Sequence, residues 1–235
     1  MVFKYSSFVV SICAMFFLTE NASAQMEFVQ NKGQWNDKIK YKGDFSTGSF
    51  FLENKGFTVV LNKAEDLLRR KEFSHGHANK SDKDISETDL TLHSFAYNVT
   101  FLGASASAAI IPDKALTIYK NYFIGNNEKK WAGNCKVYNA VTYKNIYPNI
   151  DVRYYTTQNK LKYDFIVYPG GNPSAIAMRY DGASSVNITK KELIIGTSVG
   201  EVKELEPYTY QTNVSKKMDV EIGRASCRER VLMAV

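Results

Sequence analysis

The stretch "IDVRYYTTQNKLKYDFIV", residues 150–167, decides the fold class because its apolar and polar side chains alternate with a period of two. If Gln158 and Asn159 form a hairpin turn, one side of the hairpin is apolar and aromatic. The facing pairs on this side are Thr156 with Leu161, Tyr154 with Tyr163 and Val152 with Phe165. Arg153 then faces Asp164 on the other side, which we interpret as a sheet-surface pair rather than a catalytic pair. A slip of one residue would turn every side chain to the wrong face, so the pattern specifies its own register.

The same alternation runs through the rest of the chain and predicts an all-β protein. In "SFAYNVTFL", residues 94–102, the aromatic and aliphatic positions share one side of a strand. Runs rich in Tyr, Phe, Val, Ile and Thr, separated by Gly, Asn, Pro and Lys, predict further strands at 49–53, 57–61, 116–123, 140–143, 176–180, 193–197 and 202–211. We therefore expect one antiparallel, β-sandwich-like domain over residues 25–220.

Two neighbouring segments depart from the β pattern. The charged stretch "KAEDLLRRKE", residues 63–72, predicts at most one short helix. It is followed by "FSHGHANKSDKDISETDL", residues 73–90, which is polar, charged and without period. We expect this second segment to be a long, mobile surface loop.

The first 24 residues have the features of a secretory signal peptide. Lys4 precedes an apolar run at 8–18, and the small residues Ala22, Ser23 and Ala24 follow. The apolar run is shorter than the roughly 20 residues needed to span a bilayer, so a membrane anchor is the weaker alternative. We expect cleavage after Ala24 and export by the Sec route to the extracellular space or the outer cell surface.

The C-terminal end of the chain has the features of a non-native sequence. With one legal choice of codons, "EIGRASCRERV", residues 221–231, back-translates into a common short-read sequencing adapter. A basic, solvated tail is the alternative interpretation. We interpret residues 221–235 as a non-native tail, which belongs outside fold reasoning. The domain is then C-terminally truncated, and we expect its last strand pairings to be unsatisfied.

Charge and cysteine content narrow the function classes. The formal net charge is +6, but the cations are spread among acids and tyrosines and form no run, so nucleic acid is not an expected partner. Without the signal peptide and the tail, Cys135 is the single cysteine. An exported protein of this kind has no internal disulfide, so its stability must come from a packed core.

Candidate chemical groups are few, and each has a structural alternative. His75, His77 and His93 have Asp82, Asp84 and Asp89 nearby, but their spacing matches no known metal site and most of them fall in the predicted loop. Cys135 has no sequence-local base, so we interpret it as a small apolar core residue. The Gly-rich "YPGGNP", residues 168–173, predicts a turn rather than a phosphate cradle. We assign no catalytic, cofactor-binding or metal-binding residue and expect no cofactor.

Tyrosine is abundant, with 15 residues. Exposed rings would suit sugar binding, but tyrosine also fits a half-buried strand surface. Asn98, Asn187 and Asn213 each begin an N-glycosylation pattern. We place Asn98 and Asn187 on predicted strands, and a bacterial host would normally leave these sites unmodified.

Five motifs, in this order along the chain, resemble one protein family: "FVQNKGQW" (28–35), "YKNYFIGNNEKKW" (119–131), "YNAVTYKNIYPNIDVRYY" (138–155), "LKYDFIVYPGGNPSAI" (161–176) and "IIGTSVGEVKELEPYTYQ" (194–211). The family is the uncharacterised N-terminal domain that precedes SBBP-type β-propeller repeats in exported proteins of Bacteroidetes-like bacteria. The resemblance implies a large multidomain protein, often with a type IX sorting domain or a gliding-motility-associated C-terminal domain. It implies no catalytic or ligand-binding residue.

We therefore expect a non-catalytic N-terminal module of an exported, cell-surface or secreted multidomain bacterial protein. The alternatives are a carbohydrate-binding or adhesion module and, less favoured, an enzyme. Expected partners are downstream domains of the same polypeptide, glycans or other surface proteins, with no nucleic acid and no membrane insertion of the mature chain.

Overall fold

The computed structural model describes residues 27–74, 90–157, 160–190, 192–205, 209–211, 214–218 and 231–232. In these residues every strand pairing is antiparallel. The same residues contain one α-helix, α1 (Ala64–Ser74), and two short 3-10 turns, η2 (Glu128–Lys130) and η3 (Pro173–Ala175). No helix in the described ranges has the length and hydropathy required to cross a membrane. The all-β prediction with at most one short helix is confirmed.

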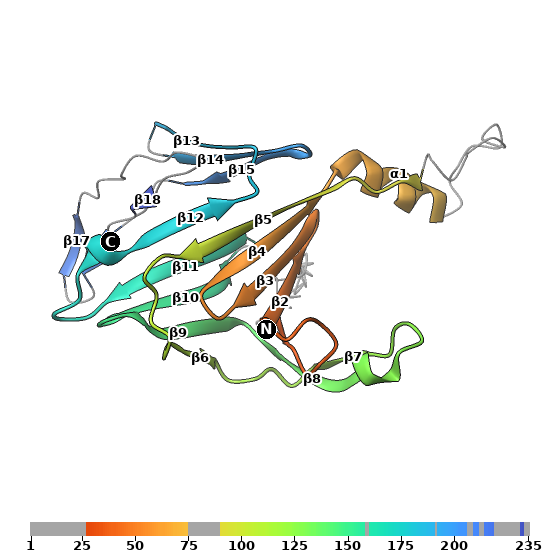
Figure 1. Cartoon of the computed structure of the whole chain (residues 1–235), viewed down its shortest axis with the longest axis horizontal. Helices are drawn as coiled ribbons and strands as arrows, with labels where there is room; N and C mark the ends of the chain where they lie inside the picture. Colours follow the sequence, from red (N-terminus) through yellow and green to blue (C-terminus); the bar gives the residue numbers. More distant parts are fainter. Residues whose placement is uncertain are drawn as a thin grey trace, which may run out of the picture.

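The largest sheet has nine strands in the order β18-β12-β5-β4-β3-β2-β1-β8-β7 (Figure 1). Its strands are β1 (Phe28–Gln30), β2 (Ile39–Phe45), β3 (Gly48–Glu53), β4 (Gly56–Asn62), β5 (Ser94–Phe101), β7 (Tyr119–Tyr122), β8 (Ala132–Tyr138), β12 (Ala177–Asp181) and β18 (Val231–Leu232). Consecutive strands β1 to β5 are neighbours in the sheet, and short turns connect β2 to β3 and β3 to β4. The chain then crosses to the far side of β1 to add β8 and β7.

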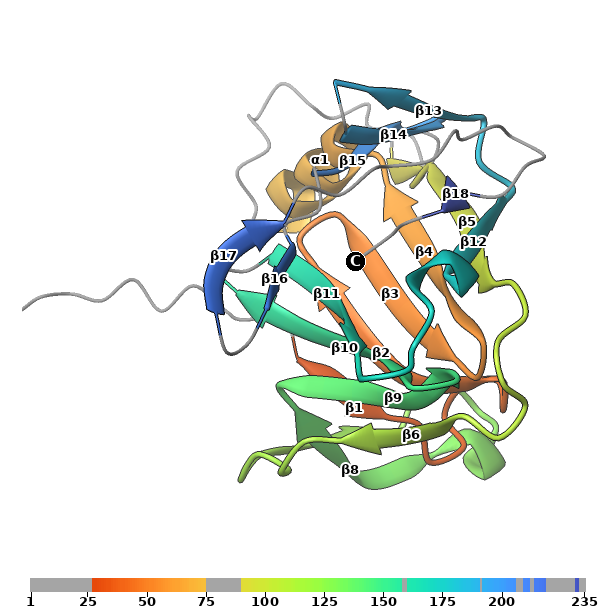
Figure 2. The same cartoon turned by 90° about the vertical axis from the view of Figure 1, so that its left-hand side faces the viewer.

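A second sheet has four strands in the order β11-β10-β9-β6, and it lies across β2 to β4 in Figure 2. Its strands are β6 (Ala109–Pro112), β9 (Ala140–Tyr147), β10 (Ile150–Thr157) and β11 (Lys160–Val167). Phe50 and Phe57 of the first sheet contact Tyr154 of the second, with ring centroids 5.6 and 5.9 Å apart. Two packed layers around one aromatic core are the sandwich-like arrangement that the alternation predicts.

Two smaller sheets complete the described part of the chain. One contains β13 (Ser185–Thr189), β14 (Glu192–Thr197) and β15 (Gly200–Glu204), and the other contains β16 (Thr209–Gln211) and β17 (Val214–Met218). The strand β18 belongs to the segment that we interpret as a non-native tail. It pairs with β12 through Ala177 and Met178 only, so most of this sheet edge has no strand partner among the described residues.

The hairpin of β10 and β11 has the register that the sequence predicts. In β10 and β11, Val152 pairs with Phe165, Arg153 with Asp164, Tyr154 with Tyr163 and Thr156 with Leu161. The expected turn at 158–159 lies outside the described residues. The two facing charges form no ion pair with each other, because Arg153 donates to Asp113 at 2.6 Å and Asp164 accepts from the Tyr155 hydroxyl at 3.3 Å. Arg153 therefore connects β10 to the segment after β6.

The sequence prediction missed several strands. It assigned no strand to β1, β2, β6 or β8, placed Asn187 on a strand without giving bounds for β13, and merged β15 and β16 into a single run. The missed strands are short or interrupted: β2 contains two lysines and a glycine, β6 ends in a proline, and β8 contains Asn134 with φ of 53°. The helix α1 also continues through Phe73 and Ser74, which were expected to begin the loop, while residues 75–89 lie outside the described residues.

Candidate functional site

The candidate site is a hairpin arm formed by β7, η2 and β8. Figures 1 and 2 both show it in green at the lower end of the molecule, where β8 and β7 form one edge of the nine-stranded sheet. Its inner face covers a small core of Val29, Ala132, Cys135 and Val137, against which Trp35, Leu116 and Tyr122 pack. The Tyr122 and Trp35 rings meet edge to face at 5.1 Å. This packing holds the arm to β1.

Cys135 is part of that inner core and has no solvent exposure. Burial raises the pKa of its thiol, so the unreactive protonated form dominates at neutral pH. Its thiol donates to the Ala132 carbonyl oxygen at 3.8 Å. Cys135 thus packs as a small apolar residue and has the wrong environment for a nucleophile.

The outer face of the arm exposes large apolar side chains. The exposed fractions are 61% for Phe123, 77% for Ile124 and 41% for Trp131, and we call these three residues the tip cluster. Tyr119, at 60%, lies farther back on β7. The Phe123 and Trp131 rings meet at 5.9 Å with their planes 66° apart. Isolated exposed apolar residues are common, but several together on one projecting segment indicate an interaction surface.

The tip cluster is held in place by its own backbone. The Trp131 indole Nε1 donates to the Gly125 carbonyl oxygen at 3.0 Å. Gly125 has φ of 75°, a region that favours glycine. The Asn127 side chain accepts from the Lys129 backbone N–H at 3.1 Å and caps η2. These bonds define the conformation of the turn before any partner binds.

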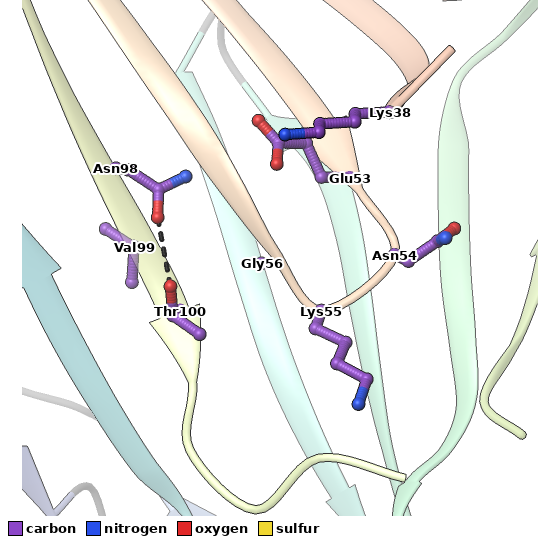
Figure 3. Close-up of a pocket in the computed structure, with 8 residues that line it drawn as sticks. All are labelled: Lys38, Glu53, Asn54, Lys55, Gly56, Asn98, Val99 and Thr100. Carbon is purple, nitrogen blue, oxygen red and sulfur yellow. Dashed lines mark hydrogen bonds between the residues drawn. The ribbon is translucent and has the colours of Figure 1, made fainter. Parts of the chain in front are cut away.

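A shallow hollow of about 350 Å³ lies where the β3–β4 turn meets β5 (Figure 3). Its polar groups bond to one another: Thr58 donates to Glu53 at 2.7 Å, Asn98 to Thr58 at 3.1 Å, and Thr100 to Asn98 at 3.0 Å. Gly56 allows the close approach of β4 to β5, because a Cβ there would lie 1.9 Å from the Val99 carbonyl oxygen. This network joins strands and leaves no nucleophile beside a base.

The buried carboxylates of the described residues are also bonded within the fold. Asp66 of α1 accepts from the His93 backbone N–H at 2.9 Å, contacts His93 Nδ1 at 2.7 Å and pairs with Arg69. These bonds, above all those from His93, hold the pKa of Asp66 well below its usual range. His93, directly before β5, therefore connects this strand to α1.

A second such group is Asp151 on β10. Burial alone would raise its pKa, but the pKa is lowered because Lys144, the Asn145 backbone and Tyr168 all donate to the carboxylate. The distances are 2.6 Å from Lys144 Nζ, 2.8 Å from Asn145 N and 2.9 Å from the Tyr168 hydroxyl. Asp151 thereby secures the irregular part of the pairing between β9 and β10, where Asn145 of β9 has φ of 51°.

Glu204 of β15 is the third carboxylate that is bonded within the fold. It accepts from the Tyr163 hydroxyl at 2.5 Å and from the Tyr180 hydroxyl at 3.1 Å. Burial raises its pKa, although both tyrosine hydrogen bonds oppose that shift. These contacts attach the three-stranded sheet to β11 and β12.

The remaining sequence candidates form no metal site within the described residues or lie outside them. Within the described ranges, no group of three or more His, Cys, Asp and Glu side chains is placed to hold a metal ion. His75, His77, Asp82, Asp84, Asp89 and Asn213 lie outside the described residues. Asn98 and Asn187 lie on β5 and β13, as predicted, and the Asn98 amide nitrogen already donates to Phe57 and Thr58. The "YPGGNP" segment forms the predicted turn, between β11 and β12.

Sequence reasoning missed the tip cluster. It assigned residues 116–123 to one strand that ends at Phe123, whereas β7 covers only Tyr119–Tyr122. The available signal was the turn sequence Gly125-Asn126-Asn127, which directly follows two large apolar residues.

Comparison with known proteins gives one match. A family model described as a domain of unknown function (DUF7948) covers residues 28–223. No curated protein and no solved structure matches the chain.

Proposed function

Since the chain belongs to the DUF7948 family, whose description assigns no activity, we propose that it is a non-catalytic interaction module of an exported bacterial protein. In this proposal, it forms the N-terminal part of a cell-surface or secreted multidomain protein. The signal-peptide features of residues 1–24 support export. The resemblance to domains that precede SBBP-type repeats, with type IX sorting or gliding-motility domains downstream, supports the multidomain context.

The tip cluster is the observation that carries the proposed interaction role. It concentrates exposed apolar area on one projecting arm, while Asp66, Asp151 and Glu204 are occupied by bonds within the fold. An apolar surface that remains exposed favours binding, because covering it removes that area from water.

Binding of the purified, labelled chain to cells of the encoding bacterium tests this role. We expect the Phe123→Ser/Ile124→Ser double variant to lose most of the binding. Leu205→Ser is the matched control, because Leu205 is 71% exposed but lies after β15, outside the arm. Equal binding by the wild type and the double variant would contradict the proposal.

A carbohydrate-binding role is the second candidate, and the exposed Tyr119 and Trp131 rings favour it. A glycan array with wild-type chain and Tyr119→Ala and Trp131→Ala variants tests it. Saturable binding to one glycan class that both variants lose would establish this role in place of the first. The tilt of 66° between the Phe123 and Trp131 rings argues against one flat sugar platform.

A further inference from the structure

We propose that the tip cluster binds the surface of an anionic lipid bilayer, with Phe123, Ile124 and Trp131 entering the interfacial layer. The proposal rests on the proposed interaction role and names its partner. It revises the expectation that no part of the mature chain enters a membrane, for a shallow contact at the tip only.

The composition of the tip cluster fits the bilayer interface. Ile124 is the most exposed of its residues, and it has no polar atom with which to recognise a sugar or a polar surface. Tryptophan is enriched at the level of lipid headgroups, where an amphipathic ring lies between water and hydrocarbon. A cluster of one exposed aliphatic side chain and two aromatic rings is therefore better matched to lipid than to glycan.

The Trp131 indole can enter an apolar layer without losing a hydrogen bond. Its N–H already donates to the Gly125 carbonyl oxygen, 3.0 Å away, within the same turn. A buried polar group without a partner is costly, so this internal bond removes a penalty that a free indole N–H would carry. The bond also fixes the ring toward the outside of the arm.

The charge of the arm favours an anionic surface. Between residues 119 and 138 there are four lysines, Lys120, Lys129, Lys130 and Lys136, and one acidic residue, Glu128. Lys120 is paired with Glu27 at 3.1 Å, whereas Lys129 and Lys130 are exposed beside the tip cluster. Basic side chains next to an inserting segment are attracted to anionic headgroups.

The shape of the arm distinguishes a bilayer from a protein partner. A stable protein interface buries about 800 Å² on each partner, spread over a complementary surface. The tip cluster consists of three exposed side chains on the segment that joins β7 to β8, and this segment lies at an end of the molecule (Figures 1 and 2). A bilayer requires no matching surface and accepts such a projection directly.

Trp131 fluorescence tests the proposal at the site itself. The chain has two tryptophans, so a Trp35→Phe background leaves Trp131 as the sole reporter. We expect its emission to shift to shorter wavelength with vesicles of phosphatidylglycerol and phosphatidylcholine, and to be quenched when the phosphatidylcholine carries brominated chains. Vesicles of phosphatidylcholine alone should bind about tenfold more weakly.

Variants in the same background separate the contribution of the apolar side chains to vesicle binding from that of the lysines. Phe123→Ser/Ile124→Ser should weaken vesicle binding about 100-fold. Lys129→Gln/Lys130→Gln should remove most of the preference for anionic vesicles, and Leu205→Ser should change neither. Because the tip cluster is exposed, circular dichroism should show unchanged folding for every variant.

Three outcomes would overturn the proposal: no spectral shift with anionic vesicles, equal binding by the Phe123→Ser/Ile124→Ser and Leu205→Ser variants, or equal binding to both vesicle types. Tip-dependent binding to cells without vesicle binding would also overturn it, in favour of a protein or glycan partner. That last result would leave the proposed interaction module intact, so the two failures are distinguishable.

Discussion

Replacing Tyr154 with phenylalanine should stabilise the protein. The Tyr154 ring lies at the centre of the core, fully buried and in contact with Phe50, Phe57 and Tyr143. Burial raises the pKa of its phenol well above 10, so the hydroxyl keeps its proton. Among the described residues, this hydroxyl has no hydrogen-bond partner. The substitution removes only that oxygen and leaves the ring packing in place.

The expected gain follows from the cost of an unpaired polar group. A buried donor without a partner costs about 1–3 kcal/mol, so the free energy of unfolding should rise by about 1 kcal/mol or more. For a domain of this size, each kcal/mol corresponds to about 2–4 °C in Tm. Urea unfolding followed by circular dichroism measures the change, and the denaturant slope should stay constant, because the surface exposed on unfolding is unchanged.

Tyr143→Phe is the matched control. Its ring is equally buried and lies 5.7 Å from that of Tyr154, but its hydroxyl donates to the Glu53 carbonyl oxygen at 2.5 Å. Removing this bond between the two layers should lower the free energy of unfolding by about 1 kcal/mol. A Tyr154→Phe variant that loses as much stability as Tyr143→Phe would refute the reasoning, since the Tyr154 hydroxyl would then have a partner.

Three further predictions concern charged groups and processing. Burial raises the pKa of Glu204, so the free energy of unfolding of the wild type should increase as the pH falls through that pKa. Glu204→Gln should abolish this pH dependence, and Glu204→Leu should lower the free energy of unfolding by about 2 kcal/mol, because it removes the acceptor of a tyrosine hydroxyl. Urea unfolding across pH measures both effects. The pKa of Asp66 is lowered, so its stabilising effect should be full above about pH 4 and fade below it. Thermal unfolding of the wild type and Asp66→Asn should therefore differ most at neutral pH and converge in acid; a constant difference would contradict the assignment. Finally, mass spectrometry of the chain secreted by a bacterial host should find Gln25 at the N-terminus, and an uncleaved product would contradict the signal-peptide prediction.

The β10–β11 hairpin shows how much the sequence could predict. Its register follows from local alternation alone, because a shift of one residue would move every apolar side chain to the solvent face. The partner of Arg153 could not be found in this way. Asp113 is forty residues distant in the sequence and approaches only because β6 pairs with β9, which in turn pairs with β10.

The strands that the sequence prediction missed also depend on residues elsewhere in the chain. The short β1 pairs with β2 on one side and β8 on the other, so its hydrogen bonds come from residues far along the chain. Three residues give too little periodicity to be recognised by sequence. Such a strand is stabilised by its neighbours, and local propensity contributes little.

Local patterns along the chain predicted the all-β class and the register of the β10–β11 hairpin, since both depend on residues close together in the chain. The packed strands alone reveal that His93 bonds to Asp66 and that Phe123, Ile124 and Trp131 are exposed on one arm. They also reveal that the Tyr154 hydroxyl has no partner among the described residues. Burial explains why these features could not be predicted from local sequence. Whether an apolar or polar side chain lies inside depends on strands that are distant in sequence, and these meet only when the two layers pack.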